Sequence, residues 1–340
     1  MKSLRNFGVA MSMIFALTSL ALYEPEPYEL KYPANFGTRT YIPENNPTTR
    51  EGVALGRMLF YEERLSANNR LSCASCHKQE FAFTDNQRFS FGVDGTATRR
   101  NSMSLANLLW VKNLFWDGRA GSLEEQAVVP MTDPHEMGQS LEVSSKKLAE
   151  TRIYPPLFEK AFGSKEIDGD KIAKAIAQFE RTMISANSKY DGYLRGEIKL
   201  SEQEKRGLTA FSLKANCVHC HGGTKTMIEL FHNNGLDTTF TDAGREDFTR
   251  SANDKGRFRV ATLRNIALTA PYMHDGRFKD LDQVLDHYGD HILDSPTLSP
   301  FLSREKLTQQ EKEDIISFLH TLTDNEFITD PRFSDPGSNP

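Results

Sequence analysis

The sequence contains two copies of the pattern Cys-x-x-Cys-His, at residues 73–77 and 217–221, and these copies use all four of its cysteines. This pattern is typical of a c-type haem attachment site. The two thiols bond to the vinyl groups of the haem, and the histidine that follows supplies a proximal nitrogen to the iron. The chain therefore predicts two covalently bound haems c. The predicted attachment residues are Cys73, Cys76, Cys217 and Cys220, and the predicted iron ligands are His77 and His221.

A zinc half-site or a disulfide is the alternative interpretation of a single cysteine pair. Zinc would usually take both cysteine pairs together, and the adjacent histidines would then not be needed. Two complete copies with no cysteine left over favour two haem sites.

The length of 340 residues exceeds what one small core needs and suggests two domains. The composition is that of an ordinary soluble globular protein. The formal net charge of −5 gives no reason to expect nucleic-acid binding.

The N-terminus predicts a secretory signal peptide over residues 1–21. Two basic residues precede an apolar stretch at residues 7–22, and small residues near position 21 fit a cleavage site. The stretch is short for a membrane-spanning helix, but an uncleaved N-terminal membrane anchor is the alternative. Haem is attached to this motif outside the cytoplasm in bacteria, so the signal and the motifs agree on a periplasmic protein.

Helical patterns dominate the rest of the chain, and strand signals are few. Thr48-x-x-Glu51 and Ser201-x-x-Glu204 are capping boxes, and each opens a helix that leads to a haem motif. A further helix is expected over residues 122–129, where Pro130 would end it.

We therefore expect a mainly α fold of two cytochrome c-like domains with long loops, each binding one covalent haem. The expected N-terminal domain is residues 22–165, and the expected C-terminal domain is residues 166–340. A helix at residues 171–184 would lie between the halves.

The two halves form an internal repeat in which a haem motif is followed by a loop and then by Asp-Gly-Arg. Thirteen residues after the aspartate of this tripeptide, the first half has Pro130 and the second half has Tyr288. Proline cannot bind iron, whereas the phenol of Tyr288 can. The other candidates for the second ligand of this iron are His287, His274 and Met273.

Several further motifs accompany the haem sites in a fixed order. They are Arg100-Asn101, residues 115–120, residues 123–127, Pro130, Glu136-Met137, residues 255–258 and residues 263–272. In this combination the chain resembles the bacterial di-haem cytochrome c peroxidases and their relative MauG. The resemblance covers nearly the whole chain after the signal peptide.

The resemblance implies a role for each half. The haem at His77 would be the peroxidatic one, and the haem at His221 the electron-transfer one. The implied substrate is hydrogen peroxide, and the implied electron donor is a small c-type cytochrome or a cupredoxin. The resemblance leaves a homodimer open.

It also implies the roles of six other residues. Gln126 and Glu136 resemble the pair on the distal side of the peroxidatic haem, and Trp116 resembles the aromatic relay between the haems. Asn101, together with the backbone carbonyls of Thr269 and Pro271, resembles the calcium site between the domains.

The chemistry of peroxide cleavage agrees with a carboxylate at position 136. The reaction needs a base for the first proton and an acid for the second, and a carboxyl group in an apolar pocket can serve as both. Glu124 and Glu125 are competing candidates, although acids in the first turn of a helix also suit its dipole.

Two departures from the usual peroxidases point toward MauG. No histidine lies in residues 78–101, where those peroxidases carry one that blocks the peroxidatic iron; by register its position is close to Val93. Tyr288 stands where they place a methionine on the second haem.

Three functions remain open from the sequence. The first is a peroxidase that reduces hydrogen peroxide. The second is a MauG-like enzyme that uses peroxide to oxidise residues of a partner protein. The third, a plain electron carrier, would have no use for the pair Gln126 and Glu136.

Overall fold

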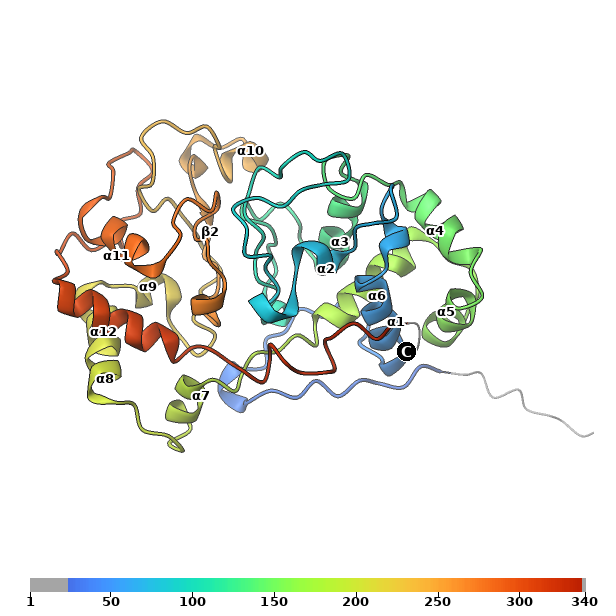
Figure 1. Ribbon diagram of the computed structural model, residues 1–340, viewed down its shortest axis with the longest axis horizontal. Helices are drawn as coiled ribbons and strands as arrows, with labels where there is room; N and C mark the ends of the chain where they lie inside the picture. The colour runs from blue at the N-terminus through green and yellow to red at the C-terminus, as the bar shows by residue number, and fades with distance from the viewer. Residues whose placement is uncertain (1–23, 338–340) are drawn as a thin grey trace, which may run out of the picture.

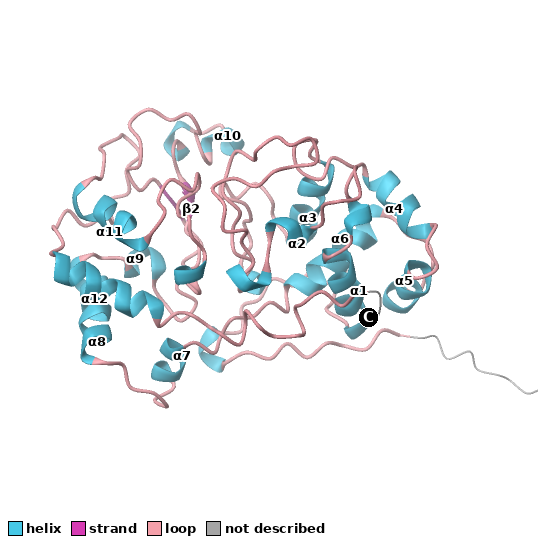
Figure 2. Ribbon diagram, in the orientation of Figure 1, coloured by secondary structure: helices cyan, strands magenta, loops and turns pink. Residues whose placement is uncertain are grey.

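The computed structural model describes residues 24–337, so the predicted signal peptide lies outside the described residues. The fold is mainly helical, as expected, and long loops connect the helices (Figure 2). Within residues 24–337, the strands are β1, Phe231–His232, and β2, Phe258–Arg259, which pair antiparallel. No helix in this part of the chain is both long and apolar enough to cross a membrane.

The helices divide between two bodies that lie side by side (Figure 1). The first body contains α1 (Arg50–Phe60), α2 (Cys73–Cys76), α3 (Leu123–Thr132), α4 (Leu141–Ala149), α5 (Tyr154–Phe162) and α6 (Gly169–Glu180). The second contains α8 (Glu202–Thr209), α9 (Val218–His221), α10 (Glu246–Thr249), α11 (Leu281–Asp290) and α12 (Gln309–His320). The short helix α7 (Lys189–Leu194) packs against this second body through Tyr190.

Each body is built on a closely packed helix pair that includes a glycine. A Cβ atom placed on Gly56 of α1 would lie 1.9 Å from the carbonyl oxygen of Ala175 in α6. In the second body, a Cβ atom on Gly207 of α8 would lie 1.8 Å from the carbonyl oxygen of Asp314 in α12. Each glycine therefore lets two helix backbones come into direct contact, and each lies on a helix that precedes a haem motif in the chain.

Helix α6 belongs to the core of the first body. Its residues Ile172 and Ile176 are buried in one cluster with Leu55 and Leu59 of α1. The expected domain boundary at residue 165 would cut this cluster. We therefore propose that the first domain extends beyond residue 180, because α6 buries its apolar face against α1.

The two ends of the described chain tie the bodies together. After α12 the chain returns to the first body (Figure 1), where Phe333 packs on Phe83 and its carbonyl oxygen accepts a hydrogen bond from Tyr61 Oη at 2.6 Å. The extended N-terminal arm runs the other way, and the carbonyl oxygen of Phe36 accepts from Lys225 Nζ of the second body. Neither body is therefore closed by its own half of the sequence.

One of the two predicted capping boxes is confirmed, and the other is shifted by one residue. The Ser201 hydroxyl accepts from Glu204 N at 3.2 Å, which confirms the second capping box. The first prediction is wrong by one residue, because Thr49, not Thr48, accepts from Gly52 N at 3.1 Å.

Helix α3 does not end at Pro130 as predicted. It continues to Thr132, and Asp133 N donates to the carbonyl oxygen of Val129 at 2.9 Å. A proline inside a helix removes one backbone hydrogen bond, and here the following turn is nevertheless kept.

The repeat is visible in three dimensions. Helices α3 and α11 each have ten residues and begin six residues after the aspartate of Asp-Gly-Arg. The loops before them match as well, since Asn107 and Asn265 both adopt left-handed backbone angles with φ of 63° and 60°. Pro130 and Tyr288 each occupy the eighth position of their helix.

The glycine at the α1–α6 contact gives a stability prediction. Replacing Gly56 with alanine should destabilise the fold by about 1–3 kcal/mol, because the new methyl group would overlap the α6 backbone. A lower thermal unfolding midpoint measured by circular dichroism would show it.

Gly289→Ala in α11 is the matched control. There a Cβ atom would lie 3.6 Å from Lys312 Cε, an ordinary contact, so alanine should leave stability unchanged or raise it by up to about 1 kcal/mol. Equal effects of the two substitutions would contradict the packing argument.

Candidate haem sites and peroxide pocket

The first haem motif presents a histidine with one nitrogen held and the other available. His77 follows α2, and its Nδ1 lies 2.8 Å from the carbonyl oxygen of Phe83. Because a carbonyl can only accept, Nδ1 carries the proton and Nε2 keeps its lone pair. Burial lowers the pKa of His77, so the ring is neutral, as a metal ligand must be.

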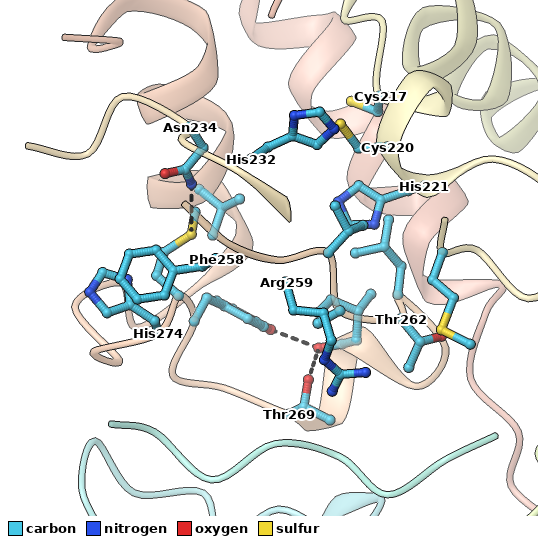
Figure 3. A pocket seen from close by; sticks show the side chains of 18 of the residues that line it. Cys217, Cys220, His221, His232, Asn234, Phe258, Arg259, Thr262, Thr269 and His274 are labelled. Atoms are coloured by element: carbon cyan, nitrogen blue, oxygen red, sulfur yellow. Dashed lines mark hydrogen bonds between the residues drawn. The ribbon is translucent and has the colours of Figure 1, made fainter. Parts of the chain in front are cut away.

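The second motif repeats this arrangement. His221 Nδ1 lies 3.4 Å from the carbonyl oxygen of Thr226. Burial lowers the pKa of His221 to about 4. In Figure 3 its ring faces the same space as Cys220, next to the second pair of thiols.

All four cysteines are free thiols in the structure. Cys73 packs against the core of the first body and Cys217 against that of the second, so one zinc ion does not have both pairs within reach. Burial raises the pKa of Cys217 to about 12 and that of Cys76 to about 11, so these thiols are protonated. The arrangement suits thioether formation better than thiolate coordination.

Glu136 lies beside the first haem motif. Val93 N donates to the carbonyl oxygen of Glu136 at 2.8 Å, and Met137 N donates to the carbonyl oxygen of Pro130 at 3.0 Å. The loop near Val93, where the resemblance placed the missing histidine, thus lies directly against Glu136. Burial raises the pKa of the Glu136 carboxyl, Asp133 adds to the rise, and Arg119 opposes it.

The two competing carboxylates, Glu124 and Glu125, already have polar partners within the protein. Glu124 forms a buried ion pair with Arg181 and accepts from Asn46 Nδ2 at 2.6 Å. Burial opposes its ionisation, but Arg181 and Asn46 outweigh that effect and lower the pKa of Glu124. Glu125 accepts from Gly121 N at 2.7 Å in the turn before α3. Neither carboxylate is as free for proton transfer as Glu136.

Gln126 lies one turn before Pro130 on α3, so the two share a face of the helix. The carbonyl oxygen of Pro130 accepts a hydrogen bond from the backbone N–H of Met137, the residue after Glu136. Within residues 24–337, the structure gives the Gln126 amide no hydrogen-bond partner. The amide therefore remains available to a ligand.

Tyr288 lines a cavity in the second body together with Cys217, Cys220 and His221. Its Oη accepts a hydrogen bond from Asn234 Nδ2 at 3.1 Å. Burial raises the pKa of Tyr288 to about 12, and the Asn234 bond opposes the rise.

The alternatives to Tyr288 are arranged less favourably. His287 points away, since its Nε2 donates to the carbonyl oxygen of Asn234 at 3.0 Å. His274 stacks on Phe258 with ring centroids 3.7 Å apart (Figure 3). Met273 lines the cavity, but its sulfur already accepts from Asn234 Nδ2 at 3.5 Å.

Trp116 connects the two bodies. Its indole Nε1 donates to the carbonyl oxygen of Asn101 at 2.9 Å, and its own carbonyl oxygen accepts from Arg259 N of β2 at 2.7 Å. It also lines the cavity that contains the second haem motif. A residue of the first body therefore forms part of the wall of the second site.

The three residues of the expected calcium site converge on the same cavity. Asn101, Thr269 and Pro271 all line it. Asn101 Nδ2 donates a hydrogen bond to the carbonyl oxygen of Gln87 at 2.7 Å, so Oδ1 of the same amide is directed away from Gln87.

No sequence pattern indicates Asn234, whose Nδ2 donates to both Tyr288 Oη and the Met273 sulfur. Asn234 lies 54 residues before Tyr288. No local pattern connects the two, so only the folded chain reveals the contact.

Two thiols and one available imidazole nitrogen at each of two separate sites are the donor groups that a two-haem cytochrome needs, and the adjacent carboxyl group is appropriate to a peroxidase. A family model described as di-haem cytochrome c peroxidase matches residues 50–199. The chain is 34% identical to the methylamine utilization protein MauG of Methylophilus methylotrophus, over 82% of this chain and 84% of that protein. It is 35% identical to cytochrome c551 peroxidase of Nitrosomonas europaea, over 82% of each chain.

The chain thus belongs to the di-haem cytochrome c peroxidase family, which contains MauG as well as the peroxidases. The crystal structure of a MauG-like protein associated with microbial copper homeostasis matches with a TM-score of 0.86 and 37% identity, covering 91% of this chain and 99% of that one. The diheme peroxidase BthA from Burkholderia thailandensis E264, at 22% identity and a TM-score of 0.73, shares the fold. The protein is an oxidoreductase of the peroxidase type, and its family carries two haem c groups.

Proposed function

We propose that the protein is a periplasmic enzyme that reduces hydrogen peroxide to water with electrons from a small c-type cytochrome or cupredoxin. Each body is a cytochrome c-like domain with one haem, bound through Cys73, Cys76 and His77 in the first and through Cys217, Cys220 and His221 in the second. The haem iron supplies the redox chemistry. The reaction consumes one peroxide, two electrons and two protons and releases two waters.

The observation that carries this proposal is the position of Glu136 against the first haem motif. Its backbone is held between the segments that precede and follow this motif, because Ala67 N donates to the carbonyl oxygen of Met137 at 2.9 Å and Val93 N donates to the carbonyl oxygen of Glu136 at 2.8 Å. Its carboxyl group is half-buried. Glu136 takes the first proton from peroxide and returns it to the departing oxygen. Gln126, on the face of α3 that carries Pro130, donates a hydrogen bond that orients the peroxide.

Electrons reach the first site from the second. Trp116 is the relay, because it lines the second site while its indole is bonded to the backbone of Asn101 in the first body. The haem at His221 receives electrons from the donor.

A MauG-like oxidation of a partner protein is the second candidate function. Two features favour it: Tyr288 in the second site and the absence of histidine in residues 78–101. Steady-state turnover of peroxide with a reduced cytochrome or cupredoxin separates the two functions. Rapid turnover supports the peroxidase; slow turnover, together with oxidation of a partner protein, supports the alternative.

We also propose a calcium ion bound by Asn101 Oδ1 and the carbonyl oxygens of Thr269 and Pro271. Oxygen donors of this kind suit calcium, and all three residues line one cavity at the contact between the bodies.

Replacing Glu136 with glutamine should keep both haems and reduce peroxide turnover by at least about a hundredfold. In the native enzyme the carboxylate form exists only above a raised pKa. As the pH is lowered, activity should therefore begin to fall at a higher pH than it would with a carboxyl group of ordinary pKa. In the Glu136→Gln variant, the residual activity should not show this loss at low pH. Glu125→Gln is the control, and a loss there instead would move the role to Glu125.

Replacing Tyr288 with methionine should raise the reduction potential of the second haem, because a neutral thioether stabilises ferric iron less than a phenolate does. Its absorption spectrum should change to that of histidine–methionine ligation. Redox titration followed at both haems measures the shift. An unchanged spectrum and potential would show that Tyr288 is only a packing residue and would return attention to Met273.

Removal of calcium by EGTA should weaken the electronic coupling between the sites. Metal analysis should find one calcium per chain before treatment, and peroxide turnover should fall after it and recover when calcium is added back. Unchanged turnover in a demonstrably calcium-free protein would rule out a functional role for the ion.

A further inference from the structure

One arginine at the contact between the bodies is buried without a counter-ion. Arg259 lies in β2, and its backbone N–H is bonded to Trp116 of the other body. Arg259 is only 6% exposed to solvent, and it lines the cavity that contains Cys217 and His221. Figure 3 shows the guanidinium group extending from β2 into this cavity, toward the first body.

The polar contacts of the guanidinium group are incomplete. Nε has no hydrogen-bond partner among residues 24–337, and Nη2 donates only to the thioether sulfur of Met103 at 3.3 Å. A thioether is a weak acceptor, and buried polar groups normally have good partners. Removal from water lowers the pKa of Arg259 to about 10, and Glu229 only partly opposes this effect.

Glu229 does not serve as its ion-pair partner. Its Oε1 accepts from the backbone N–H groups of Lys112 and Asn113, each at 2.9 Å, and its Oε2 accepts from Tyr41 Oη at 3.1 Å. No ion pair involving Arg259 is formed within residues 24–337. The buried guanidinium group of Arg259 would therefore be stabilised by an anion, and residues 24–337 do not supply one.

A second nitrogen at the same cavity is also without a partner. His232, in the strand paired with β2, has no hydrogen bond at Nε2 within the described chain, and it faces Cys217 and Cys220 (Figure 3). Two unpartnered nitrogens on one strand pair thus face the space beside the second haem motif.

We propose that Arg259 binds a haem propionate and so places a fixed positive charge between the two haem sites. The inference rests on the haem binding proposed above. Haem carries two propionate carboxylates, and the planar guanidinium group can donate two parallel hydrogen bonds to one of them. Arg259 would also keep that propionate close to Trp116, because its backbone is bonded to the same tryptophan.

This charge should raise the reduction potential of the haem whose propionate it binds. A ferrous haem holds one more electron than a ferric haem, so a nearby cation stabilises the reduced form, and a buried site weakens the screening by solvent. Arg259 thereby acts as a cofactor-binding residue that sets the driving force for transfer between the sites.

The test uses the purified holoprotein and the variant Arg259→Met, with Arg257→Met as control. The Arg257 side chain is 37% exposed on the same segment. The haem content of each protein is measured first. Redox titration should then show that Arg259→Met lowers the equilibrium constant for reduction of one haem about tenfold, which lowers its reduction potential by about 59 mV for one electron. The two haems are followed separately by their absorption spectra, so the titration shows which haem has the changed potential and therefore provides the propionate. Arg257→Met should leave both potentials unchanged.

A second variant covers a failure of Arg259→Met to retain haem. Arg259→Lys keeps the charge, so the potentials should stay near those of the wild type, while the propionate bending band in the resonance Raman spectrum should shift. Unchanged potentials in a fully loaded Arg259→Met protein, or an unchanged band in Arg259→Lys, would overturn the proposal. A wild-type protein without two haems would instead refute the proposed function.

Discussion

The contact between the two bodies is centred on a half-buried ion-pair network of Arg100. Its guanidinium group donates to Asp117 of its own body at 2.7 Å and to both oxygens of Asp242 of the other body, at 2.7 and 2.8 Å. Such a planar contact constrains orientation as well as distance. Because Asn101 and Trp116 adjoin Arg100 and Asp117 in the sequence, this contact determines how the first body enters the wall of the second site. The proposed relay and calcium site both depend on it.

The two bodies use one scaffold for different chemistry. Helices α3 and α11 have the same length and follow the same left-handed turn, yet their eighth residues are Pro130 and Tyr288. Near the first, packing leaves a half-buried carboxyl group, Glu136; near the second, it leaves a phenol bonded to Asn234. The difference lies in which side chains are directed at each site, and it supports the roles that we propose, proton transfer at the first site and electron transfer at the second.

Features with local causes could be predicted from the sequence. The capping box at Ser201 is correct because its partners lie three residues apart. Predictions failed where distant contacts decide. Thr49 replaces Thr48 as the cap where the side chain of Gln178 in α6 accepts from Thr49 N, and α3 continues past Pro130, where Met131 is buried in the core of the first body. In each case a contact across the sequence outweighed the local pattern.

The sequence alone predicted the two haem attachment sites that we propose, because the thiols and the histidine of each lie within five consecutive residues, and it determined the family through the order of its motifs. The tertiary structure decided which side chains face those sites. Tyr288 rather than His287 lines the second cavity because Asn234, more than fifty residues earlier, holds both rings in place. Likewise, Glu124 is held in an ion pair with Arg181, and the burial of Arg259 leaves its Nε without a hydrogen-bond partner among residues 24–337. These choices depend on packing between segments far apart in the chain, and therefore no local pattern records them.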